Sequence, residues 1–376
     1  MKVAIIHYWF VTRRGGEKVV ENLLKLYPDA DIYTLFYDKS TYGNYLEDHN
    51  VYVSMLGKSK FLRKHYQKIF PLYPIGIKSL RLQDNYDLVI SSESGPAKGI
   101  EIPEGTPHIC YIHSPMRYCW GYTEEYLRGM NRFLQPVARY FFNKLRKWDS
   151  GTVDNVDLYI ANSDNVKNRV NKYYNRDAKV AHPPIASELF NGPLKSNGGE
   201  HYLSFGAITP YKRIDLLVET FNRNGKKLVV VGDGAELNKL QQKAKSNITF
   251  TGALEWSEIQ KIIKNSRALI FPGEEDFGMI PLEVMAFGLP VIAYGAGGAL
   301  ETVIENKNNT GRSSGLFFGN QTVTSLQRCI DDFENKEQNF NPEWIRTHAS
   351  KFSEEHFIQK FMSLAGTYLN KETIKN

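Results

Sequence analysis

The chain is poor in cysteine and has no long apolar run. Its 376 residues include three cysteines, and none of them forms a spacing typical of metal-binding or redox pairs (Cys110, Cys119, Cys329). We therefore expect reduced thiols in a cytoplasmic protein. No apolar run approaches the roughly 18–20 residues that span a bilayer. The first residues also lack the apolar core and cleavage site of a signal peptide, so we expect neither secretion nor membrane insertion.

Acidic residues are missing from two windows in the first half of the chain. Residues 1–176 hold 25 Lys/Arg against 18 Asp/Glu, a net charge of +7, whereas residues 177–376 hold 22 against 23, or −1. The windows Lys58–Arg81 and Arg128–Lys147 contain seven and six basic residues and no acid. Charge alone also allows nucleic acid as a partner, but no nucleic-acid motif accompanies it, so we expect none.

The first window combines its charge with apolar residues at helical spacing. Leu62, Tyr66, Ile69 and Phe70 recur at i, i+4, i+7 and i+8, which predicts one apolar helix face. Four basic residues surround this face (Lys60, Arg63, Lys64 and Lys68). The pattern is typical of a helix that lies on an anionic lipid surface. We therefore expect a peripheral protein on the inner face of the cell membrane; a merely solvated basic face is the alternative.

Short apolar runs alternate with helical periodicity along the chain, which predicts βαβ units and parallel sheets. The predicted strands are Val3–Tyr8, Ile32–Phe36, Leu88–Ser91, Ile109–Ile112, Leu158–Ala161, Tyr202–Phe205, Leu228–Val231, Ile248–Thr251, Ala268–Phe271, Val291–Ala293 and Leu316–Phe318. A polar, glycine-containing stretch separates the first five from the rest. The fold class is therefore α/β, with two doubly wound Rossmann-like domains facing a cleft, divided between residues 178 and 179.

Glycine turns follow three of these strands. Gly15 and Gly16 open a helix after the first strand, Gly232 and Gly234 follow another, and Gly295–Gly298 follow a third. Ligands of such sheets bind at the carboxyl ends of the strands. Backbone N–H groups at glycine turns and helix N-termini can approach an anion closely. Together the three turns favour phosphate binding.

The strongest local signal is the segment from Pro272 to Glu283. Glu275 leaves a predicted strand, and Glu283 lies in the helix that follows. A carboxylate at a strand end can accept hydrogen bonds from sugar hydroxyls, and the backbone N–H groups of Phe277, Gly278 and Met279 can donate to them. A carboxylate on the helix can hold a ribose. Surface charge at a helix cap is the plainer interpretation of both glutamates.

This segment resembles the Glu-x7-Glu signature of the large retaining glycosyltransferase family with the GT-B fold. Gly206–Leu216, which contains Lys212 and Arg213, looks like another segment of the family, as do Gly15-Gly16-Glu17 and Tyr111–Pro115. The run from His113 to Trp120 is most similar to the branch that builds bacterial polysaccharides, including lipopolysaccharide, often with mannosyltransferases. The resemblance covers nearly the whole chain.

The resemblance implies a role for each matching residue. Glu283 would hold the ribose of a nucleotide-sugar, and Glu275 would bind the transferred sugar together with the backbone of Phe277, Gly278 and Met279. Lys212 would neutralise the diphosphate. His113 would contact the sugar. The remaining donor-binding residues would be Arg213 and four glycines (Gly15, Gly16, Gly232 and Gly234).

The resemblance also implies the reaction and its partners. A hexose, first of all mannose from GDP-mannose, would pass with retention to a glycan or polyprenyl-diphosphate-linked acceptor, without a metal or other cofactor. Residues 1–178 would bind the acceptor, residues 179–351 the donor, and a helix over 352–376 would cross back to the first domain. The family usually has Arg where this chain has Ala207. Arg213, Arg14 or a different phosphate pose would replace it.

Two other functions remain open on the same fold. One is a nucleotide-sugar epimerase or a phosphorylase. The intact Glu275-to-Glu283 segment and the basic, aromatic N-terminal face argue against the epimerase, which needs no lipid-side acceptor. The other is a non-catalytic partner subunit, which the loss of Arg at Ala207 would allow. The presence of His113, Lys212, Glu275 and Glu283 favours the transferase.

Overall fold

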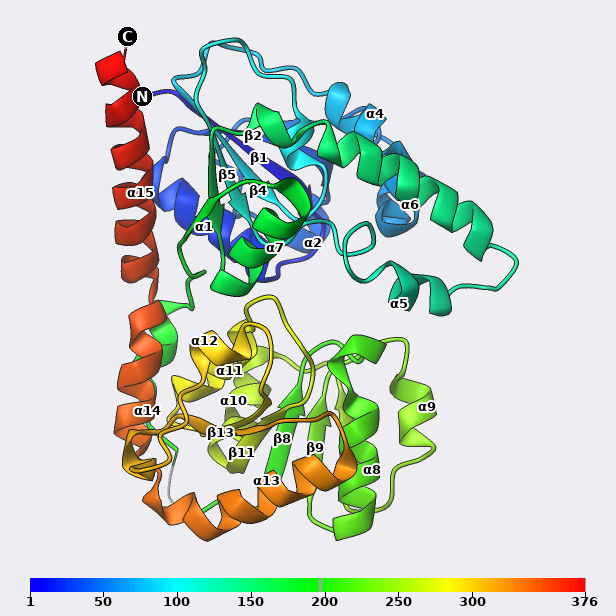
Figure 1. The fold of residues 1–376 in the computed structure, drawn as a ribbon, viewed down its shortest axis with the longest axis vertical. Helices are drawn as coiled ribbons and strands as arrows, with labels where there is room; N and C mark the ends of the chain where they lie inside the picture. The colour runs from blue at the N-terminus through cyan, green and yellow to red at the C-terminus, as the bar shows by residue number, and fades with distance from the viewer. Residues whose placement is uncertain (196–197, 376) are drawn as a thin grey trace. The chain divides into compact units, whose positions relative to one another are not determined.

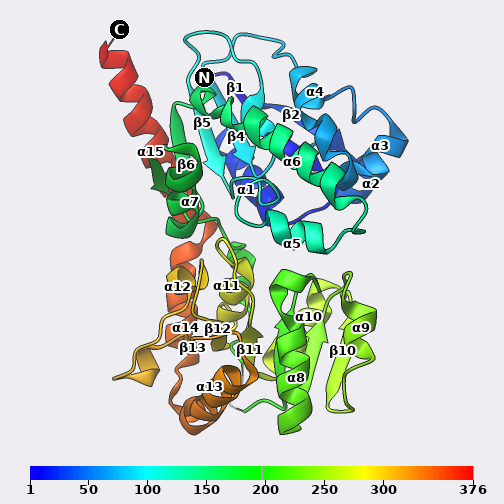
Figure 2. The same cartoon turned by 45° about the vertical axis from the view of Figure 1, so that its right-hand side comes forward.

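The computed structural model describes residues 1–195 and 198–375, with side chains up to residue 370. The chain forms two compact units, which are coloured along the sequence in Figures 1 and 2. Unit 1 contains Met1–Pro184 and the chain from Glu355 on, and unit 2 contains Ile185–Glu354. Among the described residues, no helix is both long enough and apolar enough to cross a membrane.

Unit 1 is built on a parallel sheet with the order β3-β2-β1-β4-β5-β6-β7 within the described residues. Its central strands are buried on both faces, as their largely apolar sequences favour. The strands are β1 Val3–Phe10, β2 Asp31–Tyr37, β3 Val51–Val53, β4 Leu88–Glu93, β5 His108–Ile112, β6 Leu158–Ala161 and β7 Ala178–Val180.

Helices cover both faces of this sheet. One face packs against α1 and α15, which contribute Leu23 and Phe361 to a shared core, and the other packs against α4 through Tyr73 and Ile77. The helices of unit 1 are α1 Gly15–Leu26, α2 Lys39–Tyr42, α3 Lys60–Lys64, α4 Tyr73–Lys78, α5 Thr123–Arg128, α6 Gln135–Ser150, α7 Asp164–Tyr174 and α15 Glu354–Lys375. Single 3₁₀ turns are η1 Tyr66–Lys68, η2 Phe70–Leu72, η3 Ala97–Gly99 and η4 Val153–Asn155.

The predicted apolar helix face over residues 62–70 is wrong. α3 ends at Lys64, and η1 and η2 follow as separate turns. Pro71 lies in the first turn of η2, where proline is tolerated because its missing N–H needs no partner there. The four apolar side chains pack against the core of unit 1 rather than facing solvent (Leu62, Tyr66, Ile69 and Phe70). Any lipid contact in this window therefore needs other apolar residues.

A buried ion network joins five parts of unit 1. Lys98 of η3 is fully buried, forms an ion pair with Asp149 of α6 and lies 3.7 Å from the carboxylate of Glu93 on β4. Asp149 also accepts hydrogen bonds from Trp120 Nε1 at 2.7 Å and Tyr174 Oη at 2.8 Å. A buried charge is tolerated only when it is paired and hydrogen-bonded. The network therefore fixes α6, α7 and the segment after β5 on the end of β4.

Unit 2 repeats the architecture with the strand order β10-β9-β8-β11-β12-β13, again all parallel within the described residues. Its strands are β8 His201–Phe205, β9 Leu228–Val231, β10 Ile248–Gly252, β11 Ser266–Phe271, β12 Val291–Tyr294 and β13 Gly315–Phe318. Its helices are α8 Ile214–Asn224, α9 Leu237–Gln241, α10 Trp256–Lys264, α11 Met279–Met285, α12 Ala299–Thr302, α13 Val323–Lys336 and α14 Pro342–Ala349. Five 3₁₀ turns complete it: η5 Ser187–Asn191, η6 Pro210–Lys212, η7 Thr310–Arg312, η8 Glu337–Asn339 and η9 Ser350–Phe352.

All eleven predicted strands are present. Two short strands, β3 and β7, escaped prediction because three residues carry too little pattern. Since β7 pairs with β6, unit 1 continues to Pro184 rather than ending at 178. It resumes at Glu355 rather than 352, because Phe352 packs in the core of unit 2. Residue 376, the end of the predicted crossover helix, lies outside the described residues.

Candidate active site

The candidate donor residues of unit 2 lie at the carboxyl ends of its parallel strands. Lys212 and Arg213 follow β8, Glu275 follows β11, and Glu283 lies on α11. Lys212 and Glu275 form an ion pair, and both side chains are about 15% exposed. The structure thus brings together two residues that the sequence separates widely.

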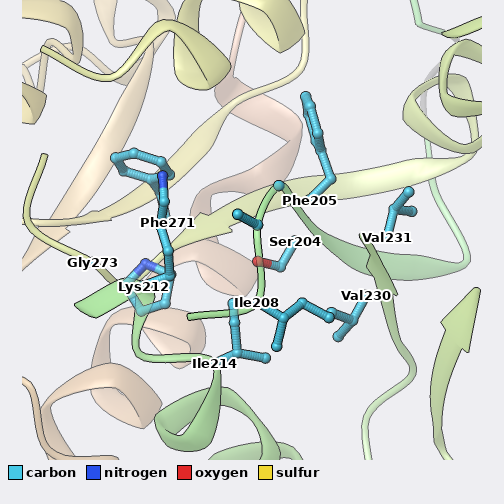
Figure 3. Close-up of a pocket in the computed structure, with 12 residues that line it drawn as sticks. Ser204, Phe205, Ile208, Lys212, Ile214, Val230, Val231, Phe271 and Gly273 are labelled. Atoms are coloured by element: carbon cyan, nitrogen blue, oxygen red, sulfur yellow. The ribbon is translucent and has the colours of Figure 1, made fainter. Parts of the chain in front are cut away.

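Lys212 is also held by aromatic rings. Its ammonium lies 5.8 Å from the centre of the Phe271 ring (Figure 3). It lies 5.5 Å from the centre of the Tyr211 ring. The backbone of the Tyr211–Lys212 turn packs directly on Gly273, where a Cβ would lie 2.8 Å from the carbonyl oxygen of Tyr211. The carboxylate and the aromatic faces together orient the ammonium. Such a cation suits an anionic ligand that can replace the carboxylate.

Figure 3 shows a pocket next to the turn that joins β8 to η6. It is lined by residues of β8, β9 and β11 and by Lys212, and its volume of about 10 Å³ leaves room for about one water molecule. Ala207 lines it and is itself exposed. The pocket is therefore a gap beneath the β8–η6 turn and is too small to hold a nucleotide.

Arg213 is engaged within the protein. Its Nε donates to Asp215 at 3.1 Å, its Nη2 to the same carboxylate at 3.2 Å, and its Nη1 to Gln321 at 3.1 Å. Gln321 in turn donates to the carbonyl of Pro272 at 2.8 Å. Arg213 thus ties the β8 turn to the end of β11. Replacing the missing Arg at Ala207 would require its guanidinium to leave these partners, and its donor role stays a prediction.

Glycines hold the turns of unit 2 against one another. Gly297 has φ +60°, and a Cβ there would lie 2.4 Å from the carbonyl oxygen of Glu275. The N–H of Gly298 donates to that same carbonyl at 2.9 Å, and a Cβ on Gly298 would lie 2.3 Å from Cα of Phe277. The turn after β12 therefore supports the Glu275–Phe277 backbone. This packing is by itself a reason for glycine there, whether or not the turn binds phosphate.

Gly232 and Gly234 serve the neighbouring turn in the same way. Both have positive φ, and Cβ atoms there would lie 1.9 Å from the oxygen of Gly206 and 2.3 Å from that of Ile208. The N–H of Ile208 donates to the carbonyl of Asp233 at 2.9 Å. The turn after β9 thus fixes the loop after β8, and phosphate binding by these glycines stays a prediction.

The segment after Glu275 ends in a helix start. Gly278, at φ +86°, precedes α11, whose first residue is Met279. Phe277 is buried, and its ring lies 5.9 Å from that of Phe352. Glu283 is half-buried on the same helix. Backbone N–H groups at a helix start have no intrahelical partner, so this segment can donate hydrogen bonds to a ligand.

The candidate residues of unit 1 meet at the carboxyl ends of β1, β4 and β5. His113 follows β5, and its Nε2 lies 2.8 Å from Ser92 Oγ. The backbone of His113 is held at both ends. Its N–H donates to the backbone carbonyl of Glu93 at 2.7 Å, and its carbonyl accepts from Asn162 Nδ2 at 3.0 Å. A Cβ on Gly16 would lie 3.5 Å from His113 Nε2. The structure thus brings together Gly16 and His113, the turn and the histidine predicted for this domain.

Two neighbours of His113 escaped the sequence analysis. Ser92 Oγ also lies 3.0 Å from His7 Nδ1, and both residues are fully buried. A signal existed, because His7 and Ser91-Ser92-Glu93 are polar residues within or ending strands that are otherwise apolar. Without the strand order, nothing in the sequence places β1 beside β4.

The four basic residues of the predicted membrane surface lie elsewhere in unit 1, on α3 and η1. Lys60, Lys64 and Lys68 are exposed. Arg63 is half-buried, lies 3.9 Å from Asp38 and donates to the carbonyl of Gly57 at 3.3 Å. Across residues 1–195 and 198–375, no group of three or more His, Cys, Asp or Glu is arranged to hold a metal ion.

The chain matches two family models in succession. Residues 13–188 match the model described as Glycosyltransferase Family 4, and residues 187–350 match the model described as glycosyl transferases group 1. The boundary between the two matches lies close to the division between unit 1 and unit 2.

Curated relatives are distant in sequence. An uncharacterized glycosyltransferase of Methanocaldococcus jannaschii is 26% identical over 90% of each chain. An alpha-1,3/1,6-mannosyltransferase of Kluyveromyces lactis is 24% identical over 74% of this chain and 65% of that protein. The O-antigen chain mannosyltransferase C of Escherichia coli is 26% identical over 47% of this chain and 49% of that protein.

Solved structures share the fold over nearly the whole chain. Anabaena HepE in complex with UDP has a TM-score of 0.65 at 18% identity, covering 98% of this chain and 100% of that one. Sucrose-phosphate synthase of Thermosynechococcus elongatus has a TM-score of 0.72 at 14% identity, covering 99% and 100%. The predicted fold class, α/β with two Rossmann-like domains in the GT-B architecture, is confirmed.

The close packing at Gly298 yields a stability prediction. Gly298→Ala places a methyl group against the backbone of Phe277, and overpacking of this kind costs about 1–3 kcal/mol. The free energy of unfolding, measured by urea titration, is expected to fall by that amount. Gly319→Ala is the matched control, since nothing lies within 4 Å of a Cβ there. Equal stability of the two variants would show that the turn yields without cost.

Proposed function

We propose that this chain, a glycosyltransferase with the GT-B fold, transfers a hexose with retention from a nucleotide-sugar to a saccharide acceptor. The observation that carries the proposal is the Lys212–Glu275 ion pair at the carboxyl ends of β8 and β11. A cation for a diphosphate and a carboxylate for sugar hydroxyls stand side by side there, next to the start of α11. Unit 2 is the proposed donor-binding unit, and unit 1 the proposed acceptor-binding unit.

GDP-mannose is the proposed donor. Several relatives are named mannosyltransferases. Three of them are named GDP-mannose-dependent and are 31%, 35% and 33% identical over 35%, 26% and 27% of this chain. The HepE structure contains UDP, so the fold also accommodates another nucleotide. The proposed reaction builds a polysaccharide or glycan such as that of lipopolysaccharide.

Each donor residue has one proposed role. Lys212 leaves Glu275 for the diphosphate, where one cation at ~4 Å contributes a gross attraction of roughly 4 kcal/mol at an effective dielectric near 20. Glu275, freed from the ammonium, accepts hydrogen bonds from sugar hydroxyls together with the N–H groups of Phe277, Gly278 and Met279. Glu283 accepts from the ribose hydroxyls. Since the leaving diphosphate gains negative charge in the transition state, Lys212 stabilises that state most.

The proposed displacement needs no protein base. The acceptor hydroxyl attacks the anomeric carbon on the face from which the diphosphate departs, and its proton passes to a departing phosphate oxygen. The new glycosidic bond therefore keeps the anomeric configuration. Lys212 and backbone N–H groups carry the charge neutralisation that a metal would otherwise supply.

The proposed acceptor is a lipid-linked saccharide presented at an anionic membrane. Unit 1 supplies the basic residues, with Lys60, Lys64 and Lys68 exposed on α3 and η1. The exposed apolar residues of the window Lys58–Arg81 are not the ones predicted from the sequence. Phe61 is 70% exposed and Ile75 is 55% exposed. The second basic window adds an exposed apolar group where α6 begins (Phe133, Leu134, Val137 and Tyr140). Basic and apolar side chains exposed together suit an anionic lipid surface.

The first prediction concerns the ribose. Glu283→Ala removes a charged hydrogen-bond acceptor worth about 1.5–3 kcal/mol, which is roughly a 10- to 150-fold loss in affinity for GDP. Isothermal titration calorimetry measures it. Glu274→Ala, which removes an exposed carboxylate next to the site, is the control and is expected to bind GDP normally. Equal affinities of both variants would exclude the ribose role of Glu283.

The second prediction concerns metals. Turnover of GDP-mannose is expected to continue in EDTA, because Lys212 and backbone N–H groups neutralise the diphosphate. The measurement is the rate of GDP release with and without the chelator. A loss of turnover that added Mg²⁺ or Mn²⁺ restores would contradict the proposed metal-free mechanism.

The third prediction concerns the membrane. Changing Lys60, Arg63, Lys64 and Lys68 to Ser removes four charges worth about 1 kcal/mol each near an anionic surface. Co-sedimentation with phosphatidylserine vesicles is expected to fall strongly, and wild-type binding is expected to weaken with salt, which screens exposed charges beyond about 8–10 Å.

Two variants serve as controls for this prediction. The triple variant that keeps Arg63, which is paired with Asp38, separates loss of charge from loss of folding. A second variant removes four exposed lysines of unit 2 (Lys227, Lys243, Lys261 and Lys307). If wild type ignores anionic vesicles at low salt, or if both sets of changes act equally, docking through α3 and η1 is wrong.

A further inference from the structure

His113 ends a hydrogen-bonded chain of three polar side chains in unit 1, whose other two members are buried. His7 and Ser92 are facing residues on the neighbouring strands β1 and β4, and both are fully buried. Ser92 Oγ lies 3.0 Å from His7 Nδ1 and 2.8 Å from His113 Nε2. The serine hydroxyl therefore bridges the two imidazoles.

The hydroxyl carries a single proton and could accept from both rings, but its own buried O–H would then have no acceptor among the described residues. The chain is therefore limited to two arrangements. Ser92 either donates to His113 Nε2 and accepts from His7 Nδ1–H, or it accepts from His113 Nε2–H and donates to His7 Nδ1. In the first arrangement the proton of His113 is on Nδ1. In the second it is on Nε2, and the proton of His7 is on its own Nε2.

The far nitrogen of His7 distinguishes the two arrangements. His7 Nε2 is buried and finds no hydrogen-bond partner among the described residues. The second arrangement would bury an N–H donor without an acceptor, which native proteins rarely do, whereas the first leaves only an unused lone pair. A charged His7 would donate from both nitrogens, but burial, followed by the nearby His113, holds the pKa of His7 well below its usual range.

We propose that His7 and Ser92 are positioning residues that fix His113 as the neutral tautomer protonated on Nδ1. The chain runs from His7 Nδ1–H to Ser92 Oγ and from Ser92 Oγ–H to His113 Nε2. His113 then offers an N–H donor at Nδ1, while its Nε2 lone pair is occupied. This inference rests on the proposed function only for its catalytic consequence.

The consequence is a specific role for His113. Taking a proton at Nε2 would reverse both hydrogen bonds and move a proton onto the unpartnered Nε2 of His7. His113 is therefore disfavoured as a general base through Nε2 and suited to donate a hydrogen bond to a sugar hydroxyl. This agrees with a displacement in which the departing phosphate takes the acceptor proton.

The other polar groups packed around this chain leave the arrangement intact. A Cβ on Gly16 would lie 2.7 Å from Tyr8 Oη and 3.5 Å from His7 Cε1, so the α1 turn covers the chain closely. Burial raises the pKa of Tyr8 far above its usual range, so its hydroxyl stays neutral. The Glu93 carboxylate is directed to Lys98, accepting from its N–H at 3.0 Å. Glu17 accepts from the backbone N–H of Arg14 at 3.0 Å.

The test is the tautomer of His113 in full-length protein labelled with ¹⁵N-histidine. Long-range ¹H–¹⁵N correlation spectra distinguish protonated from unprotonated ring nitrogens, and His113→Gln and His7→Asn assign the signals. In wild type, His113 is expected to be protonated on Nδ1 and not on Nε2, and His7 on Nδ1. A wild-type His113 protonated on Nε2 would overturn the inference, whatever the variants do.

Ser92→Ala tests the coupling. It is expected to release the His113 tautomer and to lower kcat by about 10- to 100-fold, as misplacement of a contacting group does, with KM for GDP-mannose changed far less. Ser92→Thr, which keeps the hydroxyl, is expected to keep the tautomer. An unchanged tautomer in Ser92→Ala would overturn the proposal.

The chain offers a matched control one residue away. Ser91 Oγ lies 2.8 Å from His108 Nε2, and both residues are buried, so Ser91→Ala removes a similar bond on the other face of β4. It is expected to leave the His113 tautomer and kcat unchanged; a loss equal to that of Ser92→Ala would reduce Ser92 to a folding role. Inactivity of wild type toward GDP-mannose, with the expected tautomer, would refute the proposed donor and leave the hydrogen-bond chain standing.

Discussion

Parallel pairing of the strands is the constraint on which both candidate sites depend. Because β1 pairs with β4 and β8 pairs with β11 in the same direction, their carboxyl ends lie at one edge of each sheet. His113, Lys212 and Glu275 each follow such an end. Residues far apart in the sequence therefore become neighbours without any long loop having to carry them.

Glycine packing then holds the loops at these edges. In unit 2 the turns after β9 and β12 approach the backbones of the β8 and β11 turns so closely that a Cβ would not fit at Gly232 or Gly298. Arg213 and Gln321 tie the same turns together through side chains. Loops fixed in this way keep their polar groups oriented before a ligand binds, which lowers the entropy cost of binding.

Buried polar groups give unit 1 the same kind of rigidity by different means. The Lys98–Asp149 ion pair fixes the segment after β5 from one side, and Ser92 fixes the ring of His113 from the other. Ser92 lies in a strand that begins with apolar residues, whereas Lys98 and Asp149 lie on η3 and α6. Such groups are costly unless every partner is in place, so each one restricts the geometry around His113.

The prediction from sequence failed where apolar spacing fits both a side that packs on the protein core and a side that faces a membrane. The spacing of Leu62, Tyr66 and Ile69 suits a helix facing a membrane, but those side chains pack on the core of their own unit. Periodicity shows that residues share a side of the chain; it does not show whether protein or solvent lies there. The same ambiguity affects the glycine turns, since a glycine needed for backbone packing looks like one needed for a phosphate.

By itself the sequence determined eleven of the thirteen strands in the described residues, the two-unit α/β architecture and the Glu275-to-Glu283 segment, because hydrophobic periodicity and short motifs are local properties. Only the tertiary structure decided that Lys212 pairs with Glu275, that Arg213 is held by Asp215 and Gln321, and that Ser92 bridges His7 and His113. Those contacts depend on strand order and on the space left between turns. Neither the strand order nor the space between turns is encoded in any short stretch of the chain.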